Sequence, residues 1–497
     1  MPESYILAID QGTSGTKAII FDSNGRIISK ATKELKSYFP QAGFVEQDPN
    51  EIYNSVLDSI KLCLKKFSQD PSRNLRNITT CGISNQRETF LLWNKKGNPL
   101  CRAILWQCKR SVDICDRIKS SELEDEVIER TGLIIDPYFS GTKLIWLYEN
   151  DHLVKNAIDA GDAYFGTVDT WLLFKLTQGQ SYFTDYTNAS RTLLFNINNL
   201  QWDDYLLNKF NLKKLNLPQP QPSSHLYGRS DFDGLLPEKI NISAMIGDSH
   251  AAAFGEGCFS AGMAKATMGT GSSILLNTGS KRIKSKEGMV ATICWSTSDR
   301  IDYAIEGIIV TCGATINWLR DQLGIFTDSR QTEEMALSVE NNNGVYLVPA
   351  FSGLGAPYWK MDLRAAILGL TFGCDKNHIV RAALESICYQ IKDVIAAMEE
   401  DSGIKLKELK VDGGITANHF VMQFLADLLK TNIVNIGIEE VSALGAAYLA
   451  GLQVGIFTCL DQLKNLSANK NQFYPSSDTD EIDAFYEGWK KAVQQLL

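Results

Sequence analysis

Two segments about half a chain apart repeat one pattern, and this repeat is the strongest constraint on the fold. In residues 5–22 and again in residues 263–279, an apolar run leads into a turn of glycine and hydroxyl residues, and a second apolar run follows. A strand after the turn, in place of a helix, indicates a β-hairpin. Backbone N–H groups and hydroxyls at such a tip can hold an anion. We therefore predict two anion-facing hairpins, one in each of two domains, with an ordinary polar-tipped hairpin as the alternative for the first.

The chain length and the order of the remaining segments favour an α/β fold of two domains. With 497 residues, 44% of them apolar, the chain is too long for one core and apolar enough for two. Residues 48–67 are predicted to be a helix capped by Asp48, and residues 78–84 a strand. The proline-rich residues 217–228 are predicted to be a loop. A third glycine turn leads into a helix that is predicted to begin near Thr416.

Net charge and cysteine usage argue against several classes of partner. The formal net charge of −9 disfavours nucleic acids and anionic membranes. We expect no signal peptide at the amino terminus, and no apolar run approaches the ~20 residues that span a bilayer. The eleven cysteines include no C-x-x-C pair, which predicts free thiols in a reducing cytoplasm.

Two aspartates stand where a carboxylate can take part in chemistry. Asp248 lies between an apolar strand and a helix of small residues, where it can accept a proton from a hydroxyl or cap the helix. Asp10 ends the strand before the first turn, where it can hold Mg²⁺ through water or begin the turn. These patterns by themselves leave both choices open.

Arg87, Glu88, Trp106 and Tyr138 form a second group of candidates. Arg87 and Glu88 are adjacent charges between two apolar strands, and a bend there would turn both toward one ligand. A hydrogen-bond donor beside an acceptor suits a polyhydroxy ligand, and an aromatic wall from Trp106 and Tyr138 suits its carbon chain. The alternatives are a structural ion pair for the charges and core packing for the rings.

Eight longer motifs resemble the glycerol kinases, which belong to the FGGY family of carbohydrate kinases. They follow one another along nearly the whole chain: DQGTSGTKAIIFD, SNQRETFLLW, DPYFSGTKLIWL, VDTWLLFKLTQG, DYTNASRTLLFNI, GVYLVPAFSGLGAPYW, DGGITAN and EVSALGAAYLAGL. Motifs of this length are far more specific than the short patterns above, and they favour the functional interpretation of the candidate residues.

The resemblance implies an α/β fold of two actin-like, ribonuclease-H-like domains around a central cleft. Residues 1–251 would bind a polyol and carry the first phosphate turn, and residues 252–497 would bind the nucleotide. The implied activity is ATP- and Mg²⁺-dependent phosphorylation of glycerol to sn-glycerol 3-phosphate by in-line transfer, in the cytoplasm. The implied partners are a small-molecule polyol and further copies of the chain, in a dimer or a tetramer.

The resemblance also implies roles on the nucleotide side. Asp10 would be the Mg²⁺ acid. Lys17 stands where glycerol kinases commonly have arginine, which keeps the charge but loses the planar fork, and Asn317 replaces a usual glutamine. The residues implied to face the phosphates or to hold the nucleotide are Thr13, Ser14, Gly15, Lys17, Thr270, Gly313, Asn317, Gly414 and Asn418.

On the substrate side, the resemblance makes Asp248 the base that accepts the proton of a primary hydroxyl. It places four residues in the glycerol pocket: Arg87, Glu88, Trp106 and Tyr138. Two further polyol positions depart from the pattern, because Ser249 replaces a glutamine that contacts glycerol and Ser273 replaces a phenylalanine that packs on its carbons. A roomier, more polar pocket would admit a longer substrate, so a kinase of a tetritol, pentitol or ketopentose is one alternative. A non-catalytic, ATP-binding regulator on the same scaffold is another.

Overall fold

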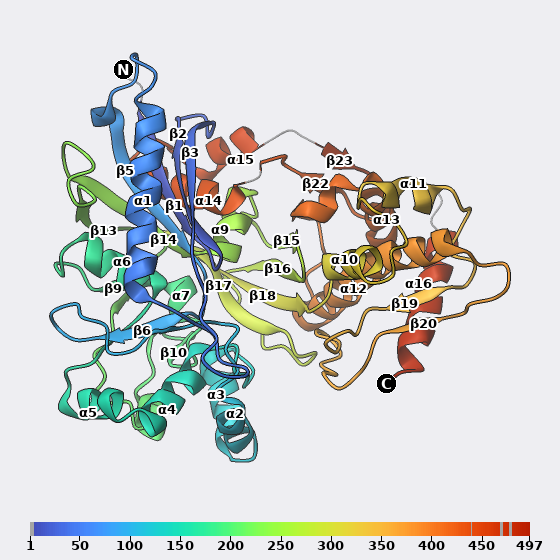
Figure 1. The fold of residues 1–497 in the computed structure, drawn as a ribbon, viewed down its shortest axis with the longest axis horizontal. Coiled ribbons are helices and arrows are strands. Elements are labelled where there is room, and N and C mark those ends of the chain that lie inside the picture. The colour runs from blue at the N-terminus through green and yellow to red at the C-terminus, as the bar shows by residue number, and fades with distance from the viewer. Residues whose placement is uncertain (1–3, 439, 468–470, 477–479) are drawn as a thin grey trace. The chain divides into compact units, whose positions relative to one another are not determined.

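The computed structural model describes residues 4–438, 440–467, 471–476 and 480–497 (Figure 1). The chain forms two compact units. The first comprises Met1–Gly257, Ala291–Tyr303 and Glu440–Ser467, and the second comprises Cys258–Val290, Ala304–Glu439 and Ala468–Leu497. The chain therefore returns to the first unit after most of the second has been built. The predicted functional division at residues 251 and 252 stays a prediction.

The main sheet of the first unit has six strands. Their order across the sheet is β13 (Ser224–Ser230), β14 (Ile240–Gly247), β5 (Ile78–Asn85), β1 (Tyr5–Gln11), β2 (Gly15–Phe21) and β3 (Ile27–Glu34). β1 and β2 are the predicted first hairpin, paired antiparallel. Strands β1, β5 and β14 run parallel, so their carboxyl ends meet at one edge, where Gln11 pairs with Asn85 and Asn85 with Gly247. Polar residues that follow these strands are thereby brought together.

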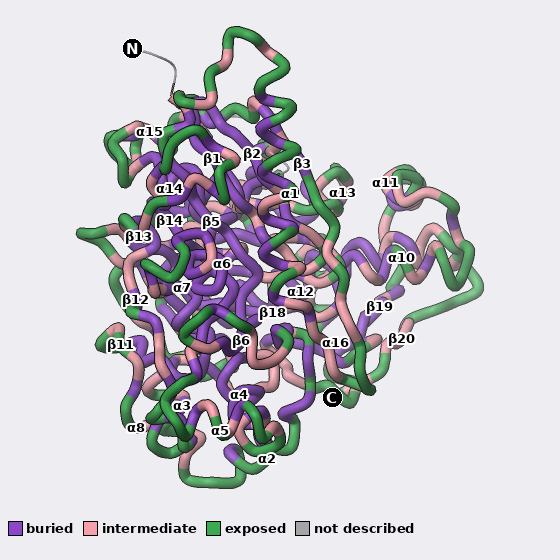
Figure 2. Tube along the Cα trace, turned by 60° about the vertical axis from the view of Figure 1, so that its left-hand side comes forward, coloured by how far each residue is buried: buried purple, intermediate pink, exposed green. Residues whose placement is uncertain are grey.

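Helices pack on both faces of this sheet. The predicted helix at residues 48–67 is α1 (Pro49–Phe67), and Asp48 caps it by accepting hydrogen bonds from two backbone N–H groups. Its buried apolar side forms a core with alternate residues of β1 and β2. On the opposite face lies α14 (Val441–Gln453), whose small residues allow close approach: a Cβ on Gly82 of β5 would lie 2.2 Å from the carbonyl oxygen of Ala446. The central strands β1, β2, β5 and β14 are mostly buried, whereas the edge strands β3 and β13 are partly exposed (Figure 2).

The rest of the first unit consists of short elements. A small sheet has the order β4 (Glu46–Gln47), β7 (Ala103–Ile104), β6 (Phe90–Trp93) and β8 (Tyr164–Thr167). Two-stranded pairs are β10 (Phe195–Asn196) with β11 (Gln201–Trp202) and β9 (Phe183–Asp185) with β12 (Gln219–Gln221). The helices are η1 (Leu75–Asn77), α2 (Val112–Lys119), α3 (Leu123–Thr131), α4 (Ser140–Asn150), α5 (His152–Ala160), α6 (Val168–Leu176), α7 (Tyr186–Ala189), α8 (Asp204–Lys209), α9 (Asp248–Gly255) and α15 (Leu460–Ser467).

The prediction of a loop over residues 217–228 is wrong in part. Residues 219–221 form β12, and β13 begins at Ser224. Proline did not prevent this, because β12 belongs to a two-stranded sheet in which Pro220 pairs with Thr184 at an edge. The proline content predicted the irregular parts of this segment but not the short strands.

The seven-stranded sheet has the order β17 (Val290–Ser296), β18 (Ile301–Ile309), β16 (Ser272–Gly279), β15 (Met263–Met268), β21 (Glu408–Asp412), β22 (Ile433–Asn435) and β23 (Asn471–Phe473). Its strands from β16 to β23 belong to the second unit, whereas residues 291–303, which include most of β17 and the first part of β18, are counted with the first unit. β15 and β16 are the predicted second hairpin. The other elements of the second unit are α10 (Gly313–Asp321), α11 (Gln331–Leu337), α12 (Lys376–Ser402), α13 (His419–Leu429), α16 (Asp480–Gln494), η2 (Gly414–Ala417), β19 (Tyr346–Val348) and β20 (Ala366–Leu368).

The α-helix predicted to begin near Thr416 begins at His419 instead. The segment Gly414–Ala417 forms a 3₁₀ turn, and Asn418 caps α13 by accepting a hydrogen bond from the N–H of Val421 at 3.1 Å. A capping asparagine therefore separates the glycine turn from the helix. Among the described residues, no helix combines the length and the apolar character needed to cross a membrane.

Candidate functional site

The tip of the first hairpin begins with a charged pair. Asp10 and Lys17 are directly opposite each other in the β1–β2 ladder, so their side chains share one face. Asp10 also accepts a hydrogen bond from the Ser84 hydroxyl at 3.1 Å. Burial raises the pKa of Asp10 to about 6, the charge of Lys17 lowers it, and the charge of Asp248 raises it. Asp10, Lys17 and Asp248 are thus within electrostatic reach of one another.

The turn between these strands is fixed by side chains from other segments. The indole N–H of Trp106 donates to the Thr13 hydroxyl at 2.9 Å, and the Gln47 amide donates to the Thr13 carbonyl at 2.7 Å. A Cβ on Gly15 would lie 2.8 Å from the carbonyl oxygen of Lys33. Ser14 is exposed at the tip. The turn is therefore rigid at its base and open at its tip.

Asp248 is the first residue of α9, directly after β14. The N-cap position is Gly247, so the capping alternative for Asp248 is not what the structure has. One carboxylate oxygen of Asp248 accepts the N–H of Ser249 at 2.7 Å and lies 3.4 Å from Nε of Arg87. The Asp248 side chain is 40% exposed, whereas that of Arg87 is 5% exposed. A buried cation thus holds an accessible carboxylate.

A bend at Glu88 sends the two adjacent charges to different partners. Glu88 has a φ of +60°, which is rare outside glycine and turns the chain sharply. Its carboxylate accepts a hydrogen bond from Nε of Arg191 at 2.6 Å, and both side chains are fully buried. Arg191 is a site residue that the sequence reasoning missed, although it is the arginine of the quoted motif DYTNASRTLLFNI.

The two aromatic candidates stand together beside this ion pair. The rings of Trp106 and Tyr138 meet edge to face with centroids 5.7 Å apart. The guanidinium of Arg191 lies 5.8 Å from the Tyr138 ring. Both rings are half-buried rather than fully packed in the core. The structure therefore joins Thr13, Trp106, Tyr138 and the buried Arg191 through a chain of direct contacts.

A buried polar network supports the strand ends that carry the charged candidates. Asp185 caps α7 and accepts hydrogen bonds from Thr187 and Asn188. The Thr187 hydroxyl in turn accepts the N–H of Gly247 at 2.8 Å, and Asn188 pairs with Asn85 at 2.9 Å. Burial raises the pKa of Asp185 to about 7. The ends of β14 and β5 are thereby tied together directly ahead of the charged residues.

In the second unit, the tip of the second hairpin packs on the start of α10. The N–H groups of Cys312, Gly313 and Ala314 donate to the carbonyl oxygens of Gly269 and Thr270 at 2.8, 2.9 and 3.1 Å. These contacts leave no room for larger residues, because a Cβ on Gly313 would lie 2.7 Å from the Gly269 oxygen. Thr270 is exposed, as is the neighbouring predicted residue Asn317.

The third glycine turn packs on the same strand end. Gly413 has a φ of +98°, and a Cβ there would lie 2.4 Å from the Met268 oxygen. Beside it, the ammonium of Lys265 donates to the Thr267 hydroxyl at 2.6 Å, and that hydroxyl donates to Asp412 at 3.0 Å. The second and third turns therefore form one backbone platform.

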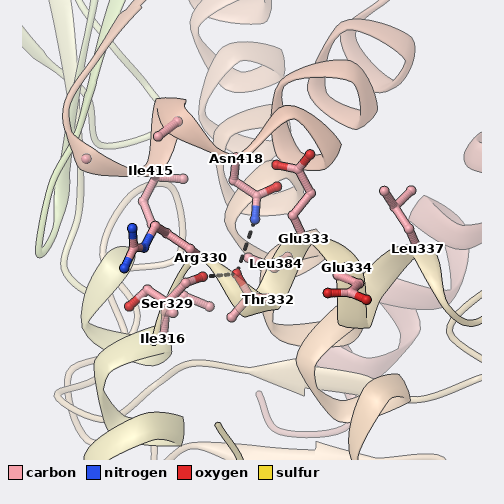
Figure 3. Close-up of a pocket in the computed structure, with 12 residues that line it drawn as sticks. Ile316, Ser329, Arg330, Thr332, Glu333, Glu334, Leu337, Leu384, Ile415 and Asn418 are labelled. Atoms are coloured by element: carbon pink, nitrogen blue, oxygen red, sulfur yellow. Dashed lines mark hydrogen bonds between the residues drawn. The ribbon is translucent and has the colours of Figure 1, made fainter. Parts of the chain in front are cut away.

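A pocket of about 520 Å³ opens next to the third turn (Figure 3). Of the predicted nucleotide residues, Gly414 and Asn418 line it, whereas Thr270, Gly313 and Asn317 are not among its lining residues. The Asn418 amide is held by Thr332 at 3.2 Å. The apolar side chains that line the pocket are those of Ile316, Leu337, Leu384, Ile415 and Ala417. The other side chains that line the pocket are polar or charged: Ser329, Arg330, Thr332, Glu333, Glu334 and Asn418. Apolar walls combined with polar groups suit a planar heterocycle.

The two unusual serines belong to different units. Ser249 follows Asp248 in the first unit. Ser273 lies on β16 in the second unit, where its hydroxyl donates to the buried carboxylate of Glu306 at 2.8 Å. This buried polar partner explains how a serine is accommodated at a position where the resemblance implies phenylalanine.

The carboxylate of Asp10 suits Mg²⁺. Within the described residues, no group of three or more His, Cys, Asp or Glu side chains could hold a metal ion. Mg²⁺ needs no such group, because it keeps several waters and is usually held by one or two carboxylates together with substrate phosphates. Asp10, next to an anion-compatible turn, provides such a carboxylate.

Two family models match the chain. The model described as the FGGY family of carbohydrate kinases, N-terminal domain, matches residues 5–255, and the C-terminal domain model matches residues 264–454. Proteins named glycerol kinase from Caldanaerobacter subterraneus and Alkaliphilus oremlandii are 46% and 45% identical to this chain, over 99% and 100% of its length and 98% of theirs.

Solved structures resemble the fold throughout. A crystal structure of Plasmodium falciparum glycerol kinase with ADP has a TM-score of 0.94 and 36% identity, and covers 100% of this chain and 98% of that one. A gluconate kinase from Lactobacillus acidophilus has a TM-score of 0.89 at 20% identity, covering 99% and 98%, which indicates the shared fold alone.

Proposed function

Since this chain belongs to the FGGY family of carbohydrate kinases, we propose that it transfers the terminal phosphoryl group of ATP to glycerol and forms sn-glycerol 3-phosphate. The matches confirm the predicted family, the predicted actin-like α/β fold and the predicted activity as an ATP-dependent carbohydrate kinase. They also set aside the non-catalytic regulator. The choice of glycerol among carbohydrates rests on one observation, the 45% and 46% identity to full-length proteins named glycerol kinase.

In this proposal Asp248 is the general base. It accepts the proton of a primary hydroxyl as that oxygen attacks the phosphorus atom in line with the departing ADP. Its exposed carboxylate is available to a substrate, and Arg87 together with the N–H of Ser249 holds it in place. These two contacts keep the base aligned before the substrate binds. Such positioning of the reacting groups contributes most of the rate enhancement of these reactions.

Glu88, Trp106 and Tyr138 bind the polyol in this proposal. Glu88 accepts hydrogen bonds from substrate hydroxyls, and its buried ion pair with Arg191 keeps the carboxylate oriented. The edge-to-face rings of Trp106 and Tyr138 cover the carbon chain. The first unit therefore supplies both the base and the polyol contacts.

The first hairpin tip faces the terminal phosphate, and the second unit binds the nucleotide. Asp10 is the residue that would hold Mg²⁺, which neutralises charge on the phosphates. Lys17 and the N–H groups of the turn at residues 13–15 face the same phosphate. Gly414 and Asn418 line the pocket that fits the base of the nucleotide.

A longer polyol is the second candidate substrate. The observation that favours it is the hydrogen bond between Ser273 and the buried Glu306, which makes this position polar. A polar group there would accommodate an additional hydroxyl in place of an apolar carbon contact.

The test of the proposed function is the identity of the product. Purified protein is incubated with ATP, Mg²⁺ and glycerol, and the product is read with an enzyme specific for sn-glycerol 3-phosphate. We expect stoichiometric ADP and sn-glycerol 3-phosphate. ADP release that requires a longer polyol and fails with glycerol would move the assignment to the second candidate.

A further inference from the structure

Glu440 lies between two lysines of the first unit. Its Oε2 accepts a hydrogen bond from Nζ of Lys17 at 2.6 Å, and its Oε1 accepts one from Nζ of Lys30 at 3.0 Å. The Glu440 side chain is 6% exposed, whereas the lysine side chains are 36% and 39% exposed. One buried carboxylate therefore holds two cations that solvent and ligands can reach.

The strand register explains why these groups meet. In the antiparallel β2–β3 ladder, Lys17 pairs with Thr32 and Ile19 pairs with Lys30, so the two lysines are diagonal neighbours on one face. Helix α14 covers this side of the sheet, and Glu440 immediately precedes it. Because α14 packs closely on the sheet, the position of Glu440 is fixed.

The charges of this cluster matter for an incoming phosphate. Burial raises the pKa of Glu440, but the hydrogen bonds from Lys17 and Lys30 hold it below its ordinary value, so the carboxylate is ionised at neutral pH. A phosphate that approaches Lys17 therefore meets a negative charge directly behind the ammonium group. The negative charge of Glu440 weakens the attraction between Lys17 and the phosphate. A second cation on the same carboxylate, Lys30, offsets that negative charge.

We propose that Glu440 and Lys30 are positioning residues for Lys17: Glu440 orients its ammonium group, and Lys30 neutralises Glu440 while Lys17 binds the terminal phosphate of ATP. This inference rests on the proposed function, in which Lys17 faces that phosphate. A lysine requires such support because its ammonium is a point charge on a flexible stem, whereas an arginine orients itself through two parallel hydrogen bonds. The pair thus compensates for the absence of arginine at this position.

The decisive variant is Lys30→Met. Its dissociation constants for a non-hydrolysable ATP analogue, ADP and AMP are measured by calorimetry with Mg²⁺ present. We expect the constant for the ATP analogue to rise about tenfold, the size of one charge-assisted contact, and those for ADP and AMP to stay within about twofold. The matched control is Lys33→Met on the same strand, since the ammonium of Lys33 forms an ion pair with the exposed Asp58 at 3.4 Å.

Glu440→Gln separates the two parts of the proposal. It removes the charge that Lys30 neutralises and the group that orients Lys17, so kcat with glycerol should fall several-fold while the ATP analogue still binds. The double variant Lys30→Met/Glu440→Gln should bind the ATP analogue about as well as the wild type, because no uncompensated carboxylate remains. A merely structural role for Lys30 would not produce this rescue.

Two results would overturn the inference. In the first, Lys30→Met weakens the ATP analogue and ADP equally, or no more than Lys33→Met does. In the second, the double variant binds the ATP analogue as poorly as Lys30→Met. Lys17→Met tells these failures from a wrong assignment of Lys17: if it leaves the ratio of ATP-analogue to ADP affinity unchanged, Lys17 does not face the terminal phosphate and the inference falls. The proposed function fails separately, if the unaltered protein forms no sn-glycerol 3-phosphate.

Discussion

The two hairpin tips share a sequence pattern but use it differently. Each needs one glycine for close approach, because a Cβ on Gly15 would lie 2.8 Å from the Lys33 oxygen and a Cβ on Gly271 would lie 2.7 Å from the Ile309 oxygen. The first tip then adds charge, with Lys17 opposite Asp10. The second tip adds backbone contacts to the start of α10 and carries no charged side chain at residues 269–273.

This difference shows that a glycine-rich turn does not define its own function. In the first unit the turn positions charged side chains, Asp10 and Lys17, which can interact with a charged ligand. In the second unit the turn is part of a platform whose shape depends on the backbone. We therefore expect side-chain substitutions to disable the first tip and added bulk to disable the second.

The largest expected effect comes from removing the proposed base in the first unit. Asp248→Asn should lower kcat with glycerol by about 10³-fold, since a positioned base contributes on this scale. ADP binding, assigned to the second unit, should be unchanged in calorimetry. Asp204→Asn is the matched control, because Asp204 is also an exposed first residue of a helix in the same unit. Turnover retained in Asp248→Asn would remove this residue as the base.

Added bulk should be the most damaging change at the second tip. Gly271→Ala forces a backbone shift, because its Cβ would lie 2.7 Å from the Ile309 oxygen. We expect a loss of about 1–3 kcal/mol in the free energy of unfolding and weaker ADP binding. In the same turn, a Cβ on Gly269 would lie 3.7 Å from its nearest neighbour, so Gly269→Ala should unfold like the wild type in thermal denaturation. Equal stability of the two variants would contradict the backbone role.

The pH dependence should distinguish the charged tip from the uncharged one. Burial raises the folded-state pKa of Asp10 from 3.8 to about 6, so Asp10 is ionised above that pH and protonated below it. If ionised Asp10 holds Mg²⁺, kcat/KM for MgATP should fall as the pH drops through about 6, by about tenfold per unit below it. The affinity for ADP without Mg²⁺ should not show this decrease at acidic pH, which is the acid limb of the profile.

Ser84→Ala sharpens the pH measurement. The Ser84 hydroxyl lowers the pKa of Asp10 through its hydrogen bond, so its removal should move the acid limb to higher pH. A limb that stays in place after this change would show that another group titrates there.

The smallest expected effect concerns substrate preference. Ser273→Phe should lower KM for glycerol relative to longer polyols by a few-fold, because the ring restores an apolar wall. Ser273→Ala is the control, since both variants lose the hydrogen bond to Glu306 and only one gains bulk. Identical selectivity in the two variants would show that position 273 does not contact the polyol.

Local patterns predicted the two hairpins and helix α1 because hydrophobic periodicity and turn chemistry are encoded within a few residues. Contacts between distant segments could not be predicted in this way. Glu440 is 423 positions from Lys17, and Arg191 is 103 positions from Glu88. Glu440 and Arg191 both lie inside the motifs that resemble the glycerol kinases. Nothing in the spacing of those motifs indicates which charged side chain forms an ion pair with each of them. The strand β12 was missed for the same reason. Its proline content predicted a loop, but its pairing with the distant strand β9 made it a strand.

The most direct test of the account compares polyols on the unaltered protein. The ratio kcat/KM is measured for glycerol, erythritol and xylitol with ATP and Mg²⁺ fixed at saturation. The account predicts that glycerol is the best substrate, by at least about tenfold over the longer polyols, which corresponds to about 1.4 kcal/mol of transition-state binding. A clear preference for erythritol or xylitol would contradict it and would mean that Ser249 and Ser273 mark a pocket built for a longer chain.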